Sequence, residues 1–257
     1  MAYLIVRATY IPLVHDEAET FFSYILPGYY LPYEGYIAAN NHFLNSFLGH
    51  WCFKLFGSST LSLRIPNLLS FPIYLFFLYR ISNEMKSKML ALALFVSLST
   101  TTFLIEFFAL TRGYGLGYAF LLAFIFNYGH YLKNRTFKNL VSTQVFLWLG
   151  LSATLTYFHL YVIFIATLVF ELIVCFRRES QIDGWKKLFF LLLFTIPVAM
   201  FILKYTLFLN SIGEINVGNF DGFYASTFES SVELLTGTKN IFPQILFVSA
   251  ITVILAG

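Results

Sequence analysis

The chain has 257 residues, of which 58% are hydrophobic and 11% charged, and its formal net charge is +3. Apolar runs long enough to cross a bilayer recur along it, and a soluble globule of this size could not bury them all. The small net charge argues against a nucleic-acid partner, and the alternating polarity typical of outer-membrane barrel strands is absent from the sequence. The sequence therefore predicts an all-α fold, a polytopic membrane helical bundle.

The first fourteen residues are apolar but too short to span a membrane, and they carry Arg7. We interpret them as the last turns of a first span whose beginning is missing. Residues 241–257 similarly enter a span and stop within it. We therefore expect one transmembrane module over residues 1–257, with a partial first span and a missing C-terminal part, as in a fragment of a longer protein.

Six full spans are predicted between these ends, each about 20 residues long because the bilayer core requires that length. In chain order they are residues 61–81, 89–105, 113–132, 140–157, 160–176 and 188–209. The partial span at residues 241–257 would be the next.

Basic residues set the expected orientation, because positive charge accumulates on the cytoplasmic side of membrane proteins. Three short loops on one side carry ten of the sixteen Lys and Arg residues: Arg80, Lys86, Lys88, Lys133, Arg135, Lys138, Arg177, Arg178, Lys186 and Lys187. Nine of the thirteen acids fall on the other side. That side is predicted to face the periplasm, the lumen or the exterior.

Two external loops are predicted to be long, residues 15–60 and 210–239. In the first, Asp16 followed by Glu19 is a variant of the capping box, which predicts a helix from Asp16 to Leu26. Residues 41–56 place aromatic and leucine side chains on one face and polar side chains on the other, the pattern of a helix in the membrane interface. The first loop is thus expected to form an external, interfacial helix pair.

Asp16 is the first candidate for chemistry. Three carboxylates between apolar segments are costly unless they face water and act there. At a helix N-terminus the Asp16 carboxylate is stabilised in its charged form, in which it could accept a proton from a hydroxyl or bind a divalent cation. The alternative is a plain N-cap. The neighbouring Glu17 and Glu19 are interpreted as solvated or capping residues.

The external turn between the spans 89–105 and 113–132 carries Glu106 and Arg112. Glu106 could be a second metal ligand or accept a hydrogen bond from substrate, and Arg112 could hold a phosphate through two hydrogen bonds. The alternatives are an ion pair between the two residues, or Arg112 snorkelling at a helix end. Gly113 and Gly115, which follow, predict close helix packing or approach of the backbone to a ligand.

Further polar residues are expected on the same side. Arg64 lies just inside a span, where snorkelling is the alternative to substrate binding. Lys204 lies near the outer end of its span and is a candidate to bind a lipid-linked phosphate. His159 lies in an external turn, and His42 opens the interfacial helix beside the expected N-cap Asn41. Together the sequence predicts an outward-facing cavity rimmed by Asp16, Glu106, Arg112, His159 and Lys204.

Three stretches also form an ordered set: the string from His15 to Phe21, residues 41–66 with Leu63-Arg64-Ile65-Pro66 at their end, and residues 109–116 around Arg112 and Tyr114. The first resembles the Asp-Glu signature in the first external loop of the GT-C glycosyltransferases, among them the protein O-mannosyltransferases and the lipid A aminoarabinose transferase. The others are similar to that superfamily's interfacial helix with its Leu-Arg-Leu-Pro span start, and to its Ala-Arg-x-Tyr-x-Leu motif. The resemblance covers residues 1–176.

The resemblance implies inverting transfer of a sugar from a polyprenyl-phosphate donor to an acceptor hydroxyl on a glycan, lipid or protein, on the periplasmic or luminal side. Asp16, in the catalytic pair Asp16-Glu17, would be the general base or an acid of a metal site. Arg112 and Tyr114 would line the donor site. A divalent cation (Mg²⁺ or Mn²⁺) held by Asp16 and Glu106 is left open. The protein is expected in a bacterial inner membrane with its active side facing the periplasm.

Two alternatives remain at this point. One is a non-catalytic membrane protein, such as a lipid-linked-sugar transporter or an assembly partner, and the other is an inactive truncated homologue. A transporter predicts charges on both sides of the membrane midplane. Here Glu171 is the main acid inside a span, so the one-sided distribution of charge favours the enzyme.

Overall fold

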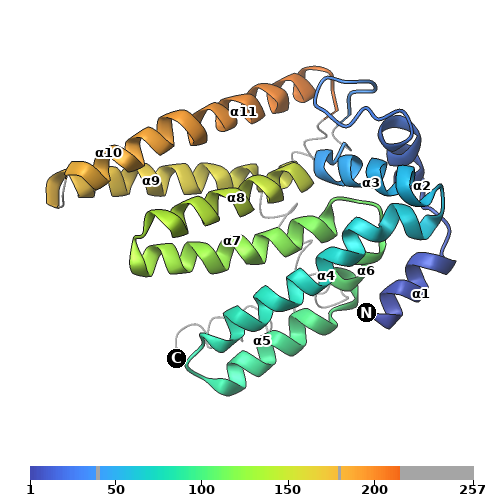
Figure 1. Ribbon diagram of the computed structural model, residues 1–257, viewed down its shortest axis with the longest axis horizontal. Coiled ribbons are helices and arrows are strands. Elements are labelled where there is room, and N and C mark those ends of the chain that lie inside the picture. Colours follow the sequence, from blue (N-terminus) through green and yellow to red (C-terminus); the bar gives the residue numbers. More distant parts are fainter. Residues whose placement is uncertain (39–40, 179–180, 215–257) are drawn as a thin grey trace, which may run out of the picture. The chain divides into compact units, whose positions relative to one another are not determined.

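The computed structural model describes residues 1–38, 41–178 and 181–214 (Figure 1). Every regular element in these ranges is helical, as the sequence predicts. The expected span 241–257 and most of the loop 210–239 lie outside the described residues. In chain order the elements are α1 (Ala2–Tyr10), α2 (His15–Thr20), the π-helical η1 (Phe21–Ile25), α3 (Phe43–Phe56), α4 (Thr60–Asn83), α5 (Lys88–Thr100), α6 (Thr102–Glu106), the 3-10 turn η2 (Phe107–Ala109), α7 (Tyr114–Asn134), α8 (Phe137–Ala153), the 3-10 turn η3 (Leu155–Tyr157), α9 (Phe158–Arg178), α10 (Gln181–Phe190), the π-helical η4 (Leu191–Thr195) and α11 (Ile196–Ser211).

Three helical segments of the described chain are long and apolar enough to cross a membrane: Thr60–Asn83, Leu155–Ile173 and Gly184–Ser211. A fourth candidate is α5 together with Thr102–Ala109, a pair bent by 51° at the break between them. These four segments correspond to four of the six full spans predicted from the sequence. The described residues thus contain three to four helices that could span a membrane, compatible with a multi-pass membrane protein.

The other two predicted spans, 113–132 and 140–157, form the helices α7 and α8, which are not among these candidates. α8 has only 17 residues, fewer than the roughly 20 that cross a bilayer core. α7 has 21 residues, but Asn127, His130 and several tyrosines lower its hydropathy. The two helices pack along one another, and α7 also packs against α4, so they form the interior of the bundle.

The two larger of three apolar clusters account for most of the packing between the described helices, because each buries many large apolar side chains. One joins α7, α8, α9 and the segment leading to α11, and includes Phe124, Leu147 and Phe164. The other joins α1, α4 and the entrance to α7, and includes Leu4 and Phe108. Figure 1 shows the turns from α4 to α5 and from α7 to α8 at the left of the bundle, while α2 and α3 lie at the right. The basic loops and the acidic string therefore lie at opposite ends of these helices.

The helix α3 buries its polar face and exposes its apolar one. The buried side of this helix consists of Asn45, Ser46, Gly49 and His50. Trp51, Leu55 and Phe56 are 49%, 70% and 62% exposed. The prediction that the two kinds of side chain lie on opposite faces is confirmed, and the polar face is the one that packs on the protein. A partly exposed apolar face on the described part of the chain is typical of a surface that meets a non-aqueous neighbour.

Candidate functional site

The helix α2 places two consecutive carboxylates in different environments. Val14 is the N-cap, and its N–H donates to Glu17 Oε2 at 3.1 Å. The expected capping by Asp16 with Glu19 is therefore wrong, because Glu17 does the capping. The side chain of Asp16 is 53% exposed, whereas that of Glu17 is completely buried. Only the first of the two carboxylates can be reached by a molecule from solution.

Glu17 forms an ion pair with Arg64, and both side chains have 0% exposure. Arg64 Nε donates to Glu17 Oε1 at 2.9 Å and Nη2 to Oε2 at 2.5 Å. The other guanidinium N–H groups donate to the backbone carbonyls of Ala8, Ile11 and Pro12. All five guanidinium N–H groups are used, so none is left for a ligand. The geometry supports neither snorkelling of Arg64 nor the predicted roles of Arg64 in substrate binding and Glu17 in catalysis; both residues hold the fold together.

A buried hydrogen-bond network connects the Glu17–Arg64 pair to the start of α7. Glu17 Oε1 also accepts from the backbone N–H of Thr111 at 2.6 Å. The Thr111 carbonyl accepts from Asn45 Nδ2 at 3.2 Å, and Asn45 Oδ1 accepts from Asn67 Nδ2 at 2.7 Å. Asn67 Oδ1 in turn accepts from the backbone N–H of Leu116 at 3.1 Å. These bonds fix α2, α3, α4 and the start of α7 relative to one another.

Asp16 and Arg112 form the second link between the same two segments. Arg112 Nη1 pairs with Asp16 Oδ2, and the Arg112 side chain is only 13% exposed. The guanidinium carbon lies 5.4 Å from the centre of the Tyr114 ring, and Nη2 lies 3.5 Å from the Tyr114 hydroxyl. Arg112 Nε is buried and has no hydrogen-bond partner among the described residues. Two consecutive residues of α2 thus engage two consecutive residues before α7: Asp16 binds Arg112, and Glu17 binds Thr111.

His42 adds a neutral imidazole beside this ion pair. It is the N-cap residue of α3, the place at which Asn41 was expected. His42 Nδ1 lies 2.9 Å from the Ala153 carbonyl oxygen; because a carbonyl only accepts, Nδ1 carries the proton. Burial, followed by the nearby charge of Arg112, lowers the pKa of His42 from 6.5 to about 4. The imidazole is therefore neutral near pH 7 and has an acceptor lone pair on Nε2.

That Nε2 atom is also buried and has no hydrogen-bond partner among the described residues. Tyr114 connects it to the ion pair, because its ring centre lies 5.0 Å from the His42 ring and under the Arg112 guanidinium. Buried polar atoms without partners are uncommon in native proteins, and each one calls for an explanation. An acceptor on His42 and a donor on Arg112, both beside Tyr114, would be satisfied by a bound polar molecule.

The two glycines before and in α7 allow this close assembly. A Cβ at Gly113 would lie 1.8 Å from the Ala153 carbonyl oxygen and 2.9 Å from His42 Cβ. A Cβ at Gly115 would lie 2.9 Å from Asn67 Oδ1. The close helix packing predicted from these glycines is confirmed, and the group that approaches them is protein.

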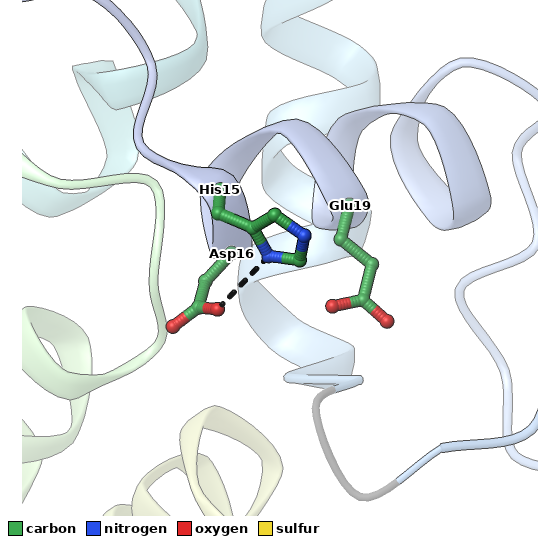
Figure 2. A group of neighbouring side chains, drawn as sticks. All are labelled: His15, Asp16 and Glu19. Carbon is green, nitrogen blue, oxygen red and sulfur yellow. Dashed lines mark ion pairs between the residues drawn. The ribbon is translucent and has the colours of Figure 1, made fainter.

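A partly exposed cluster on α2 offers ligands for a cation. Potential ligand atoms of His15, Asp16 and Glu19 lie within 4.8 Å of one another (Figure 2). One imidazole nitrogen with carboxylate oxygens suits Mn²⁺ better than Mg²⁺, which prefers an all-oxygen shell. Glu106, the predicted partner of Asp16 in a metal site, is absent from this group and pairs with Arg7 at 3.3 Å. The described chain thus offers Asp16 different ligand partners from the one predicted.

Two predicted site residues lie outside these contacts. His159 is exposed, and its Nδ1 lies 3.4 Å from the Thr156 carbonyl oxygen. Lys204 is exposed on α11, one turn after Phe201. No ion pair or hydrogen bond of the described residues joins either one to Asp16 or Arg112. The structure therefore brings together four of the predicted residues: Asp16, His42, Arg112 and Tyr114.

An apolar cavity of about 280 Å³ adjoins the contact between His42 and Ala153. Its lining includes Phe43, which follows His42 in the chain, and Ser152, which precedes Ala153. The opposite wall comes from α11 and includes Phe201. This cavity could take an apolar chain next to the polar site.

The chain matches no protein-family model, no curated protein and no solved structure. The residues around Asp16 and Arg112 are therefore the basis for a functional assignment.

Proposed function

We propose that this protein is a GT-C-like glycosyltransferase that moves a sugar from a polyprenyl-phosphate donor to an acceptor hydroxyl on the periplasmic or luminal face of a membrane. The observation that carries the proposal is the ion pair between half-exposed Asp16 and largely covered Arg112, beside unpartnered polar atoms of Arg112 and His42. The site thus combines the Asp16 carboxylate, which an acceptor can reach from solution, with the Arg112 cation, which can bind a phosphate. These are the two charges that the reaction needs.

In the proposed reaction the acceptor hydroxyl gives its proton to the Asp16 carboxylate as its oxygen attacks the anomeric carbon. The bond between that carbon and the phosphate oxygen breaks, and the electron pair leaves with polyprenyl phosphate. Arg112 stabilises the departing phosphate through its guanidinium charge and its Nε donor. His42 Nε2 accepts a hydrogen bond from the bound sugar, since a neutral imidazole with its proton on Nδ1 can only accept there. Attack from the face opposite the phosphate inverts the anomeric centre.

The surroundings of the site suit an amphiphilic donor. The exposed aromatic and leucine side chains of α3 would lie in the membrane interface, with the polar face of the helix against the bundle. The apolar cavity beside His42 and Ala153 would receive the first part of the polyprenyl chain. The lipid would then enter from the bilayer and the acceptor from water, with Asp16 at the boundary between them.

A divalent cation fits the cluster of His15, Asp16 and Glu19. When bound, such a cation supplies positive charge that stabilises the negative charge developing on the departing phosphate. With the cation held by all three residues, Asp16 would be an acid of the metal site and not the general base, the second of the two roles that the resemblance implies.

The described charges favour an enzyme over a transporter. Glu171, the main acid inside a candidate span, accepts hydrogen bonds from Arg135 and the Tyr131 hydroxyl and is therefore neutralised in place. The acidic α2 lies at the end of the helices opposite the basic turns, in line with a bacterial inner-membrane protein whose site faces the periplasm (Figure 1).

Substitution Asp16→Asn in the membrane-inserted protein tests the proposal, with transfer from a polyprenyl-phosphate sugar as the assay. Loss of a catalytic acid or base should lower the rate by about 10²–10⁴-fold. The melting temperature should stay close to that of the parent protein, because an ion pair with an exposed carboxylate contributes little stability. Glu34→Gln is the matched control, since Glu34 is an exposed acid away from the site. Full activity of the Asp16→Asn protein would refute the assignment.

A further inference from the structure

A second cavity, of about 460 Å³, lies at the basic end of the bundle between the end of α4 and the start of α5. Its lining divides into a polar and an apolar part. The polar part includes Ser82, Asn83, Lys86 and Lys88, and the apolar part includes Leu92 and Phe95. The cavity is separate from the site around Asp16, which lies at the other end of α4.

The two lysines bring positive charge that no neighbouring acid neutralises. Lys86 and Lys88 are exposed, and neither forms an ion pair with a described residue. The acid closest to them in the chain, Glu84, already pairs with Lys133 at 2.7 Å and lies 2.7 Å from His130 Nε2. The hydrogen bond from Lys133 lowers the pKa of Glu84 below its ordinary value, so this acid stays charged and paired with Lys133. The cavity thus has a net positive wall.

Ser82 supplies an independent sign of a missing ligand. Ser82 is only 4% exposed, and its Oγ has no hydrogen-bond partner among the described residues. A helical serine often donates to the carbonyl one turn earlier, and a buried hydroxyl left without a partner destabilises the folded state. Because Ser82 lines the cavity, an oxygen of a bound ligand would satisfy it.

The start of α5 strengthens the attraction for an anion. α5 has 13 residues and begins at Lys88, on the wall of the cavity. The N-terminus of a helix carries a partial positive charge and backbone N–H groups that favour anions. Two lysines, a helix N-terminus and an unpaired buried hydroxyl therefore converge on one cavity.

We propose that this cavity binds the phosphate headgroup of an anionic phospholipid. Phosphate oxygens would accept from Lys86, Lys88 and Ser82 Oγ, and the start of an acyl chain would lie against Leu92 and Phe95. A lipid is favoured over free phosphate because of this apolar wall, and because the cavity lies where two candidate spans end, at the depth of lipid headgroups.

The test measures binding of single lipids to the purified, detergent-solubilised chain by native mass spectrometry. Phosphatidylglycerol is compared with phosphatidylcholine and with inorganic phosphate. The variants are Lys86→Gln with Lys88→Gln, and Ser82→Ala. Lys138→Gln is the matched control, because Lys138 is an exposed lysine of the neighbouring basic turn and does not line the cavity.

Phosphatidylglycerol is expected to bind more tightly than phosphatidylcholine. Loss of both lysines should weaken this binding about 30-fold. Each basic residue near an anionic lipid contributes about 1 kcal/mol to binding, and 1.4 kcal/mol corresponds to a tenfold change in affinity. Ser82→Ala should weaken it about tenfold, and Lys138→Gln should leave it unchanged. Equal binding of the two lipids, or equal binding of phosphatidylglycerol to parent and double variant, would overturn the proposal. Inorganic phosphate that displaces the lipid at equal concentration would assign the cavity to a soluble anion and overturn the lipid headgroup.

Discussion

Replacing Glu17 by Gln is expected to destabilise the whole protein, whereas Asp16→Asn in the preceding position is expected to remove activity alone. The reason is burial: both partners of the Glu17–Arg64 pair have 0% exposure, while the Asp16 side chain is 53% exposed. Glutamine keeps the size of glutamate but not its charge. The Arg64 guanidinium would then be left buried among carbonyl groups without a counter-charge.

The magnitude follows from the contacts of Arg64. Two of its five N–H groups donate to Glu17, and the other three donate to backbone carbonyls that cannot neutralise the charge. Breaking a buried ion pair by removing one partner costs about 3–5 kcal/mol. In a protein of this size each kcal/mol lowers the melting temperature by about 2–4 °C, so we expect a decrease of about 6–20 °C.

Thermal unfolding of the detergent-solubilised protein, followed by size-exclusion chromatography, measures this decrease. Glu34→Gln again serves as the control, because Glu34 is exposed and makes one hydrogen bond to the backbone of Leu31. A second substitution, Arg64→Met on the Glu17→Gln background, should recover part of the loss by removing the uncompensated charge. If Glu17→Gln melts within about 2 °C of the control, the pair does not hold α2 in place and the reasoning fails.

Two further substitutions test the site. Gly113→Ala should lower both the melting temperature and activity, because the new Cβ would lie 1.8 Å from the Ala153 carbonyl oxygen. Gly129→Ala meets no atom within 4 Å and should stabilise α7 by about 0.5–1 kcal/mol. Equal changes in melting temperature for the two variants would contradict the close packing at Gly113. The folded-state pKa of His42, about 4, lies below its ordinary 6.5, so the unfolded chain binds a proton first and stability should fall as pH is lowered from 6.5 to 4. Melting temperatures across that range should fall less steeply for His42→Asn than for the parent, and the exposed His159→Asn should change nothing; parallel curves would show that His42 is not buried in neutral form.

Much of the fold could be predicted from hydropathy, because bilayer-length apolar runs leave a strong signal. The spans 61–81, 160–176 and 188–209 coincide with helices that could cross a membrane. The spans 113–132 and 140–157 could not be separated from these by pattern alone. Their helices bury apolar side chains against protein, and they differ little from the other spans: α8 is slightly shorter than a bilayer core requires, and polar side chains lower the hydropathy of α7.

The site could be predicted in part. Asp16 and Arg112 stand out because charged residues are rare in this chain, and the structure pairs them. Glu106, the expected partner of Asp16 in a metal site, forms an ion pair with Arg7 instead. Such a choice depends on which helices are neighbours, and the sequence contains no information on the distance between α1 and α6. For the same reason the buried network of Glu17, Arg64 and Thr111 has no local signal.

The division of labour between Asp16 and Glu17 explains why the chain keeps an ion pair in its interior at all. A buried pair seldom stabilises a protein more than apolar residues of the same volume would, so stability alone does not account for Glu17 and Arg64. Their contacts do account for position: Glu17 holds the Thr111 backbone, and Arg64 holds the carbonyls that lead into α2. Because the segments that carry Asp16 and Arg112 are both held in place, these two side chains meet near the surface without a ligand to order them. The proposed transfer from an anionic donor would require a preorganised carboxylate and cation, and this requirement would account for the buried pair.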